Sequence, residues 1–263
     1  MNDTLVSCLM VTANRAIHAQ HAIVCFEKQT HANCELVIID DGDEDYSGLV
    51  EASPARDRIR YHRLVPDSRL TLGDLRNMAI EAADGEWLIQ WDDDDWYHPR
   101  RIEVQLATAI RLGAGASALK WTLVDVRGSE GENLRFRADA GIATPGTILF
   151  RRGSFRYPSL AKNEDGVFLR TVRKDCKLAV LGGDHSYLFV RVHHGSNTWN
   201  LDHFISKLRR TPPRFVSYLF ARHVRNDVRS MKVFRLRRSE VETFETMDAQ
   251  VLSCESFARA STS

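Results

Sequence analysis

The sequence contains few cysteines, and none is placed as one of a closely spaced pair. Its 263 residues include five cysteines, which are scattered, odd in number and never spaced as CxxC. This usage argues against a disulfide framework and against a zinc knuckle. Long apolar runs are also absent, since no stretch approaches the ~20 residues of a membrane-spanning helix. The first residues, "MNDTLVSCLMV", lack the basic region of a signal peptide, and we therefore expect a cytoplasmic protein.

The chain has almost no net charge, so overall charge identifies no partner. The formal charge is +1, but residues 207–238 hold eleven Lys or Arg and one acid, Asp227, which is a local charge of +10 and leaves −9 for the rest. Two prolines in "RRTPPRF" stop any helix at the start of this segment. We predict a main domain over residues 1–205 and a basic, helical C-terminal extension over residues 206–263.

The basic extension allows two interpretations. Its sequence "RFVSYLFARHVRNDVRSMKVFRLRR" mixes aromatic and aliphatic residues with arginine, which suits peripheral contact with the inner, anionic face of a membrane. The same residues suit an arm that packs on the main domain or joins two copies in a homo-oligomer, and this second interpretation is slightly favoured. No recognition motif accompanies the charge, so we expect no nucleic-acid partner.

The order of sequence patterns predicts the fold class. Apolar runs typical of buried strands alternate with segments whose apolar residues have helical spacing. This alternation predicts an α/β fold with a mostly parallel sheet flanked by helices, in which ligands bind beyond the carboxyl ends of the strands. The expected strands cover residues 5–11, 34–40, 58–64 and 86–91, and the expected helices cover residues 15–29, 72–86, 98–113 and 166–174.

Four aspartates, Asp92 to Asp95, follow one of these strands in "GEWLIQWDDDDWYHP". If the chain stays extended, Asp92 and Asp94 face one way and Asp93 and Asp95 the other. Two carboxylates about 5 Å apart repel by roughly 3 kcal/mol at an effective dielectric constant of 20. A divalent cation removes this repulsion, and carboxylate oxygens suit Mg²⁺ or Mn²⁺. The alternative is a solvated loop in which one aspartate caps the next helix, but a cap explains one carboxylate and not four.

Several motifs together resemble the bacterial family 2 glycosyltransferases. In order, they are "VTANR", "ELVIIDDG", "LGDLRNMAIEAADGEWLIQWDDDDWYHP", "NEDGVFLR" and "RVHHGSNTW", within residues 4–205. The resemblance implies the GT-A fold, with a Rossmann-like nucleotide-binding half and an acceptor half. It also implies an inverting transfer of a sugar from a nucleoside diphosphate sugar to a hydroxyl of a glycan, lipid or other acceptor.

The resemblance assigns residues to donor binding. The proline and tyrosine of the family's first motif are absent from "VTAN", so contact with the base would depend on Thr12 and its backbone. One of Asp40 and Asp41 would face the base, although a tight turn also explains them. Arg76 offers the planar fork of donors that suits a phosphate or a base, whereas a lone arginine is more commonly an exposed helix charge. The donor-binding set is Thr12, Asn14, Arg15, Asp40, Asp41, Arg76, Asn77, Asp92 and Asp93.

The resemblance also assigns metal and catalytic residues. Asp92 and Asp94 match the Asp-x-Asp motif that holds Mn²⁺ or Mg²⁺ on the donor diphosphate, and His194 would complete the metal shell. The alternative for His194 is a loop histidine that bonds to the backbone. Asp165 would be the general base that accepts the acceptor proton, with Glu164 as the substitute candidate. The alternative for this pair is helix capping.

Two functions are alternatives to a glycosyltransferase. A nucleotidyltransferase or a pyrophosphohydrolase usually carries a glycine-rich phosphate loop after the first strand, and "VTANRA" contains no glycine. A non-catalytic nucleotide-sugar-binding module is expected to lack the acidic cluster or the Glu-Asp pair, and this chain has both. The sequence leaves open the identity of the nucleotide, the sugar and the acceptor.

Overall fold

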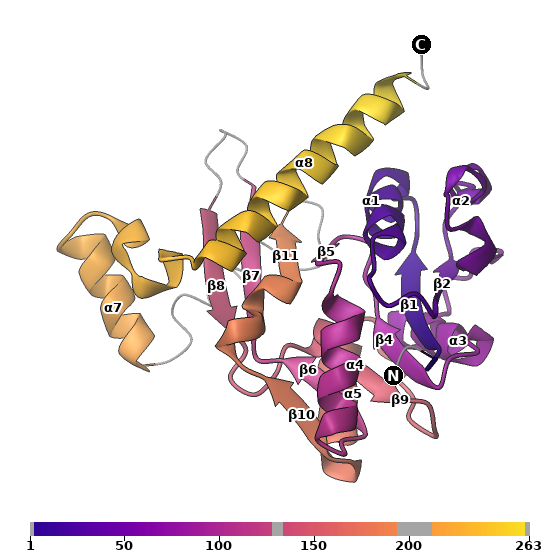
Figure 1. Ribbon diagram of the computed structural model, residues 1–263, viewed down its shortest axis with the longest axis horizontal. Coiled ribbons are helices and arrows are strands. Elements are labelled where there is room, and N and C mark those ends of the chain that lie inside the picture. The colour runs from indigo at the N-terminus through magenta and orange to yellow at the C-terminus, as the bar shows by residue number, and fades with distance from the viewer. Residues whose placement is uncertain (1–2, 128–133, 194–211, 261–263) are drawn as a thin grey trace.

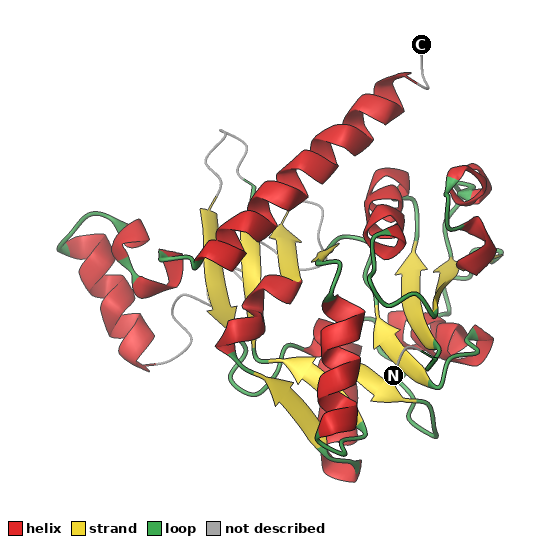
Figure 2. Cartoon of the chain, in the orientation of Figure 1, coloured by secondary structure: helices red, strands yellow, loops and turns green. Residues whose placement is uncertain are grey.

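The computed structural model describes residues 3–127, 134–193 and 212–260, and it contains two β-sheets (Figure 1). The four-stranded sheet lies between helix α7 and the seven-stranded sheet, and helices α1 to α3 lie at the far end (Figures 1 and 2). In Figure 1, helix α8 runs diagonally upward from beside the smaller sheet. Among the described residues, no helix is long and apolar enough to cross a membrane.

The larger sheet is mostly parallel, as predicted. Its strands stand in the order β10-β6-β9-β4-β1-β2-β3, and β9 is the strand that runs antiparallel to both of its neighbours. The bounds are β1 Val6–Thr12, β2 Cys34–Asp40, β3 Ile59–Arg63, β4 Trp87–Gln90, β6 Ala116–Leu119, β9 Leu149–Arg151 and β10 Leu178–Leu181. The four strands expected from the sequence correspond to β1 to β4; the ends of β2 agree, and those of the other three differ by one residue.

Helices cover both faces of this sheet because successive side chains of a strand point to opposite faces. Cys8 and Met10 of β1 pack in the core that contains α1 and α4, and Leu9 packs in the core that contains α3 and α5. The helix bounds are α1 Ala16–Glu27, α2 Ser47–Ala52, α3 Leu72–Ala82, α4 Arg101–Arg111 and α5 Glu164–Asp175. Short 3₁₀ turns lie at Arg56–Arg58, Pro145–Thr147, Gly183–Leu188, Val228–Ser230 and Lys232–Phe234.

Helix α3 lies against the loop that precedes α5, and its first residues explain why. Thr71 and Asp74 form a capping box that satisfies the first free N–H groups of the helix. A Cβ atom at Gly73 would lie 1.8 Å from the carbonyl oxygen of Pro158, so this close approach requires a glycine. The contact holds the start of α3 against the loop that precedes α5.

The smaller sheet was not predicted. Its order is β5-β11-β7-β8, and its strands are β5 Trp96–Tyr97, β7 Trp121–Val126, β8 Leu134–Asp139 and β11 Phe189–His193. Because β4 belongs to the first sheet and β5 to the second, the four aspartates between them form the connection from one sheet to the other.

The last helix of the C-terminal extension packs against the main body of the molecule. Helix α8, Arg238–Ala260, buries Phe244 and Met247 in the same core as α1 and the first sheet. Arg135 of β8 binds the Asp248 carboxylate through two N–H groups at 2.8 and 2.6 Å. These contacts agree with the interpretation of the extension as an arm that packs on the main domain, and the boundary at residue 206 stays a prediction. Helix α7, Pro212–His223, covers the outer part of the smaller sheet.

Candidate active site

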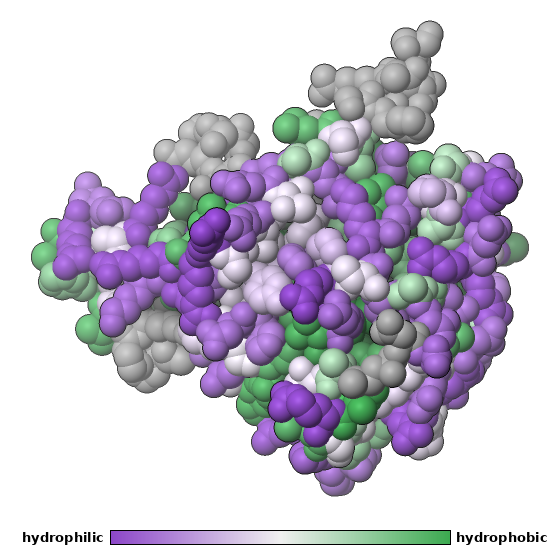
Figure 3. Space-filling model, viewed as in Figure 1, coloured by the Kyte–Doolittle hydropathy of each residue, from purple (hydrophilic) through white to green (hydrophobic). Residues whose placement is uncertain are grey.

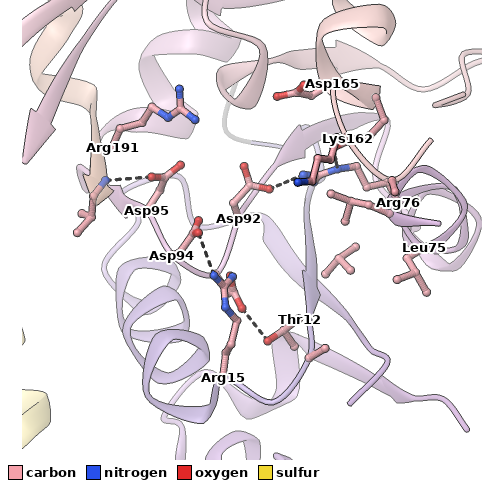
Figure 4. Close-up of a pocket in the computed structure, with 17 residues that line it drawn as sticks. Thr12, Arg15, Leu75, Arg76, Asp92, Asp94, Asp95, Lys162, Asp165 and Arg191 are labelled. Carbon is pink, nitrogen blue, oxygen red and sulfur yellow. Dashed lines mark hydrogen bonds and ion pairs between the residues drawn. The ribbon is translucent and has the colours of Figure 1, made fainter. Parts of the chain in front are cut away.

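The acidic loop, residues Asp92 to Asp95, lines a pocket of about 270 Å³ at the carboxyl ends of β1 and β4 (Figure 4). The chain turns at Asp93 and Asp94 instead of continuing as a strand. The expected alternation of the four side chains between two faces is therefore wrong, because it assumed an extended chain. The turn brings all four aspartates to the wall of one pocket.

Asp93 is the most buried member of the acidic loop. Thr12 Oγ1 donates to Asp93 Oδ2 at 2.8 Å, and Arg15 Nη1 donates to Asp93 Oδ1 at 2.8 Å. Arg15 Nη2 also reaches Asp94 Oδ2 at 3.3 Å. Burial, and then repulsion from Asp94, raise the pKa of Asp93 to about 7, although Arg15 acts in the opposite direction. The end of β1 thus supplies a hydroxyl and a cation that hold the loop.

Arg76 connects three elements of the pocket. Its Nη2 donates to Asp92 Oδ1 at 2.8 Å, and its Nε donates to Glu164 Oε1 at 3.0 Å. Its guanidinium lies 5.6 Å from the ring centroid of Tyr157. Burial by itself would lower the pKa of Arg76, but the nearby Asp92 and Glu164 carboxylates raise it overall, so this arginine remains charged. Arg76 therefore ties α3 to the acidic loop and to the start of α5.

The neighbouring carboxylates Glu164 and Asp165 have different environments. Glu164 is 3% exposed and is paired with Arg76, and burial raises its pKa. Asp165 is half-buried, lines the pocket and accepts a hydrogen bond from the Gly166 N–H at 2.6 Å. Figure 4 shows Asp165 on the α5 side of the pocket, apart from the acidic loop.

The buried cation Arg101, at the start of α4, supports the first part of the acidic loop. Arg101 is fully buried, and its Nη2 donates to the Gln90 carbonyl oxygen at 3.0 Å. Its guanidinium lies 4.6 Å from the ring centroid of Tyr97, whose hydroxyl donates to the Asp92 carbonyl oxygen at 2.8 Å. Burial lowers the pKa of Arg101, while Asp92 is among the groups that oppose this shift. The backbone at the start of the loop is thus held by α4 and β5.

Eight of the residues predicted for the site line the pocket: Thr12, Arg15, Arg76, Asp92, Asp93, Asp94, Glu164 and Asp165. Four others lie outside it: Asn14, Asp40, Asp41 and Asn77. Asn14 adopts a positive φ of 54° in the turn after β1. Asp40 is buried and accepts a hydrogen bond from Tyr61 Oη at 2.7 Å, and Asn77 bonds to both backbone groups of Tyr157. These contacts fix turns and loops, and the donor-binding roles of the four residues stay predictions.

The pocket also contains three charged residues to which the sequence assigned no individual role. Asp95 Oδ1 accepts a hydrogen bond from the Val192 N–H at 3.2 Å, and burial followed by repulsion from Asp94 raises the pKa of Asp95. Arg191 of β11 and Lys162, just before α5, add positive charge to the lining. The sequence signal for Arg191 is the alternation of apolar and polar residues in "FVRVH", which is typical of a strand. The sequence signal for Lys162 is its place beside the Glu-Asp motif.

The donor set of the pocket fits a divalent cation only in part. Among the described residues, no group of three His, Cys, Asp or Glu side chains is arranged to hold an ion, and His194 lies outside them. The Asp92 and Asp94 side chains are 22% and 20% exposed, so their oxygens are accessible from the pocket. Mg²⁺ is commonly held by one or two carboxylates together with substrate phosphates and water, and Asp92 and Asp94 match that pattern.

Comparison with known proteins identifies the family. A pocket at the carboxyl ends of a mostly parallel sheet is where open α/β folds bind their ligands. Residues 7–168 match the family profile described as glycosyl transferase family 2, and the chain belongs to this family. The fold is of the GT-A type, as expected from the motifs.

Two curated relatives align with part of the chain. An uncharacterized glycosyltransferase of Rickettsia felis is 36% identical over 107 residues, which cover 40% of this chain and 17% of that protein. WfgD of Escherichia coli, a UDP-Glc:alpha-D-GlcNAc-diphosphoundecaprenol beta-1,3-glucosyltransferase, is 28% identical over 111 residues, which cover 42% of this chain and 43% of WfgD. The chain thus spans less than half the length of these relatives.

Among solved structures, TarS of S. aureus, residues 1–349 in complex with UDP, superposes with a TM-score of 0.58 and 15% sequence identity. The superposition covers 95% of this chain and 80% of that chain. At this level of identity the similarity concerns the fold. It includes the C-terminal part of this chain, which the family profile does not reach.

Proposed function

We propose that this chain is a metal-dependent, inverting glycosyltransferase of polysaccharide biosynthesis. It would move a sugar from a nucleoside diphosphate sugar to a hydroxyl of a glycan, lipid or other acceptor. The observation that carries this proposal is one pocket whose wall includes the acidic loop, Arg76 and Asp165. The family assignment supports the reaction class, and the UDP complex of TarS supports a nucleoside diphosphate donor.

The donor diphosphate would lie between the acidic loop and the basic residues of the pocket. Asp92 and Asp94 would hold Mg²⁺ or Mn²⁺, with His194 as a further ligand. When bound, this ion stabilises the negative charge that develops on the leaving diphosphate. Lys162 and Arg191 would direct N–H groups towards the same charge, as the pocket already places both in its wall.

Asp165 would act as the general base. In a single displacement, the acceptor oxygen bonds to the anomeric carbon while the bond to the diphosphate oxygen breaks, and the acceptor proton passes to the Asp165 carboxylate. Glu164 is less suited to this role because its carboxylate is buried against Arg76. We assign Glu164 to positioning, since it fixes Arg76 and the first turn of α5. An inverting displacement of this kind requires no nucleophile from the enzyme.

A donor panel tests the proposal. The protein would be incubated with UDP-, GDP- and dTDP-sugars, with and without Mn²⁺, and with glycan acceptors. Release of a nucleoside diphosphate together with a glycosylated acceptor, dependent on Mn²⁺ and abolished by Asp165→Asn, is the expected result. Release of pyrophosphate or of a nucleoside monophosphate would instead indicate a nucleotidyltransferase or a pyrophosphohydrolase. Donor binding with no turnover on any donor and acceptor pair would favour a binding module.

A further inference from the structure

Helix α7 exposes a continuous apolar face. Its described side chains Tyr218 and Ala221 are buried against the smaller sheet. Five other large apolar residues of α7 are exposed, which are Phe215 (46% exposed), Val216 (65%), Leu219 (38%), Phe220 (48%) and Val224 (68%). Their spacing places them together on one side of the helix. Contiguous apolar surface of this kind marks an interaction site more often than isolated exposed residues do.

Positive charge lies beside part of this apolar face, since Val216 and Phe220 line one pocket together with four cations. A pocket of about 670 Å³ opens between α7 and the smaller sheet, and its wall contains Arg137, Arg225, Lys232 and Arg235. The guanidinium of Arg225 lies 5.3 Å from the ring centroid of Phe220, so charge and apolar surface are interleaved. Residues 212–238 contain eight Lys or Arg and one acid, Asp227, a formal charge of +7. The Asp227 carboxylate caps the following turn by accepting from the Arg229 N–H.

We propose that this region is a docking surface for an anionic lipid bilayer. The α7 surface consists of the five exposed apolar residues of α7 together with Arg225, Lys232 and Arg235. The apolar side chains enter the boundary between headgroups and acyl chains, and the cations bind headgroup phosphates. Apolar residues flanked by Lys and Arg on a surface helix suit this interfacial position. In Figure 3, hydrophobic residues appear at the outer edge of the α7 region, with hydrophilic ones around them.

Charge complementarity favours a bilayer over a second copy of the chain. Most dimers are symmetric and bring the same patch of both subunits together. Two α7 surfaces in such a dimer would place two segments of formal charge +7 against each other. An anionic bilayer offers negative charge and an apolar interior at the same place, which matches both features of the surface.

The test is sedimentation of the full chain with vesicles of phosphatidylcholine, with and without phosphatidylglycerol. We expect binding to the anionic vesicles that weakens at high salt, because the attraction fades within a Debye length of about 8 Å at physiological ionic strength. Lys232→Glu with Arg235→Glu should weaken binding by roughly thirtyfold or more, from about fivefold for each cation near the surface. Val216→Ser with Phe220→Ser should weaken it by at least about tenfold.

Matched controls separate this surface from general charge and hydrophobicity. Arg173→Glu with Lys174→Glu makes the same charge change on exposed residues of α5, and Val65→Ser removes an apolar side chain that is 88% exposed elsewhere. Both should leave vesicle binding unchanged. Equal losses in the controls, equal binding to neutral vesicles, or no binding at all would each overturn the proposal. A mass in solution that falls with Val216→Ser and Phe220→Ser, without vesicle binding, would assign the surface to a second copy and would also overturn it.

Discussion

The active-site pocket and the α7 surface differ in whether their charged side chains are paired within the protein or exposed to solvent. In the pocket, the aspartates are drawn into a concave wall and are bound by groups of the protein itself, such as Thr12, Arg15 and Arg76. On the α7 surface, charges of one sign stand exposed beside exposed apolar side chains. Charge that is held and partly buried can tune chemistry, whereas exposed charge of one sign mainly selects a partner. Four predictions test this difference.

The largest effect is expected when the pocket loses its two accessible carboxylates. Asp92→Asn combined with Asp94→Asn should weaken binding of UDP, GDP or dTDP in the presence of Mn²⁺ by roughly a thousandfold, because a metal–diphosphate contact is worth several kcal/mol. Calorimetry with and without Mn²⁺ measures this. Asp57→Asn, at an exposed carboxylate outside the pocket, is the control. Equal affinities of the double variant and the unaltered protein would rule out a metal-dependent site at the acidic loop.

The next effect separates chemistry from binding within the pocket. Asp165→Asn should lower kcat by at least about a hundredfold, the usual scale for the loss of a general base, and should leave donor affinity nearly intact. Glu164→Gln should retain more activity and the same pH profile, because Glu164 acts through Arg76. Steady-state kinetics across a pH series provides the measurement. If Asp165→Asn turned over normally and Glu164→Gln did not, the two roles assigned here would be reversed.

The third prediction concerns the sheet on which α7 rests. Arg135→Met should lower the free energy of unfolding by about 2 kcal/mol, because it removes the charge-assisted bonds to Asp248 and one partner of the fully buried Asp125. Denaturant unfolding followed by circular dichroism would show the change. Arg238→Met removes an exposed pair within α8, the helix that carries Asp248, and should cost no more than about 0.5 kcal/mol. Similar losses in both variants would mean that α8 is not anchored through Arg135.

The smallest expected effect depends on pH and concerns His98, which follows β5. His98 packs against Tyr187, and burial lowers its pKa from 6.5 to about 4. Between these values the unfolded chain binds a proton that the folded chain does not, so stability should fall as pH falls from about 6.5 to 4. Allowing for the partial exposure of the ring, the loss between pH 7 and 5 should be about 1 kcal/mol. In His98→Gln this part of the pH dependence should disappear. An unchanged pH profile would show that the imidazole is solvated.

Local pattern was a good guide to the first half of the fold. Strands such as "CELVIID" are continuous apolar runs, and the structure has β2 at Cys34–Asp40 as expected. The smaller sheet was not foreseen, because β5 has two residues and "LRFRAD" becomes a strand by pairing with β7. The sequence predicts a helical C-terminal extension but not the partners of α8, since its contacts with β8 and α1 join residues far apart in sequence.

The candidate site was predicted in pieces. Motif resemblance selected Arg76, Asp92 and Glu164 separately, and the structure joins them by two hydrogen bonds. It did not select Arg191, since that residue reaches the pocket only through the pairing of β11 with β5 and β7. The roles of Glu164 and Asp165 also could not be separated from the sequence, because neighbouring carboxylates look equivalent until one of them is buried.

The sequence by itself determined the alternation of strands and helices, the acidic run at the end of β4 and the uneven distribution of charge. These features depend only on residue type and on spacing along the chain, so they can be recognised without the structure. The tertiary structure determines that the acidic run turns and faces one pocket, that Glu164 is paired and Asp165 is open to that pocket, and that α7 buries one side and leaves five apolar side chains exposed. Each of these outcomes depends on burial and on partners distant in the chain, and burial is a property of the whole fold.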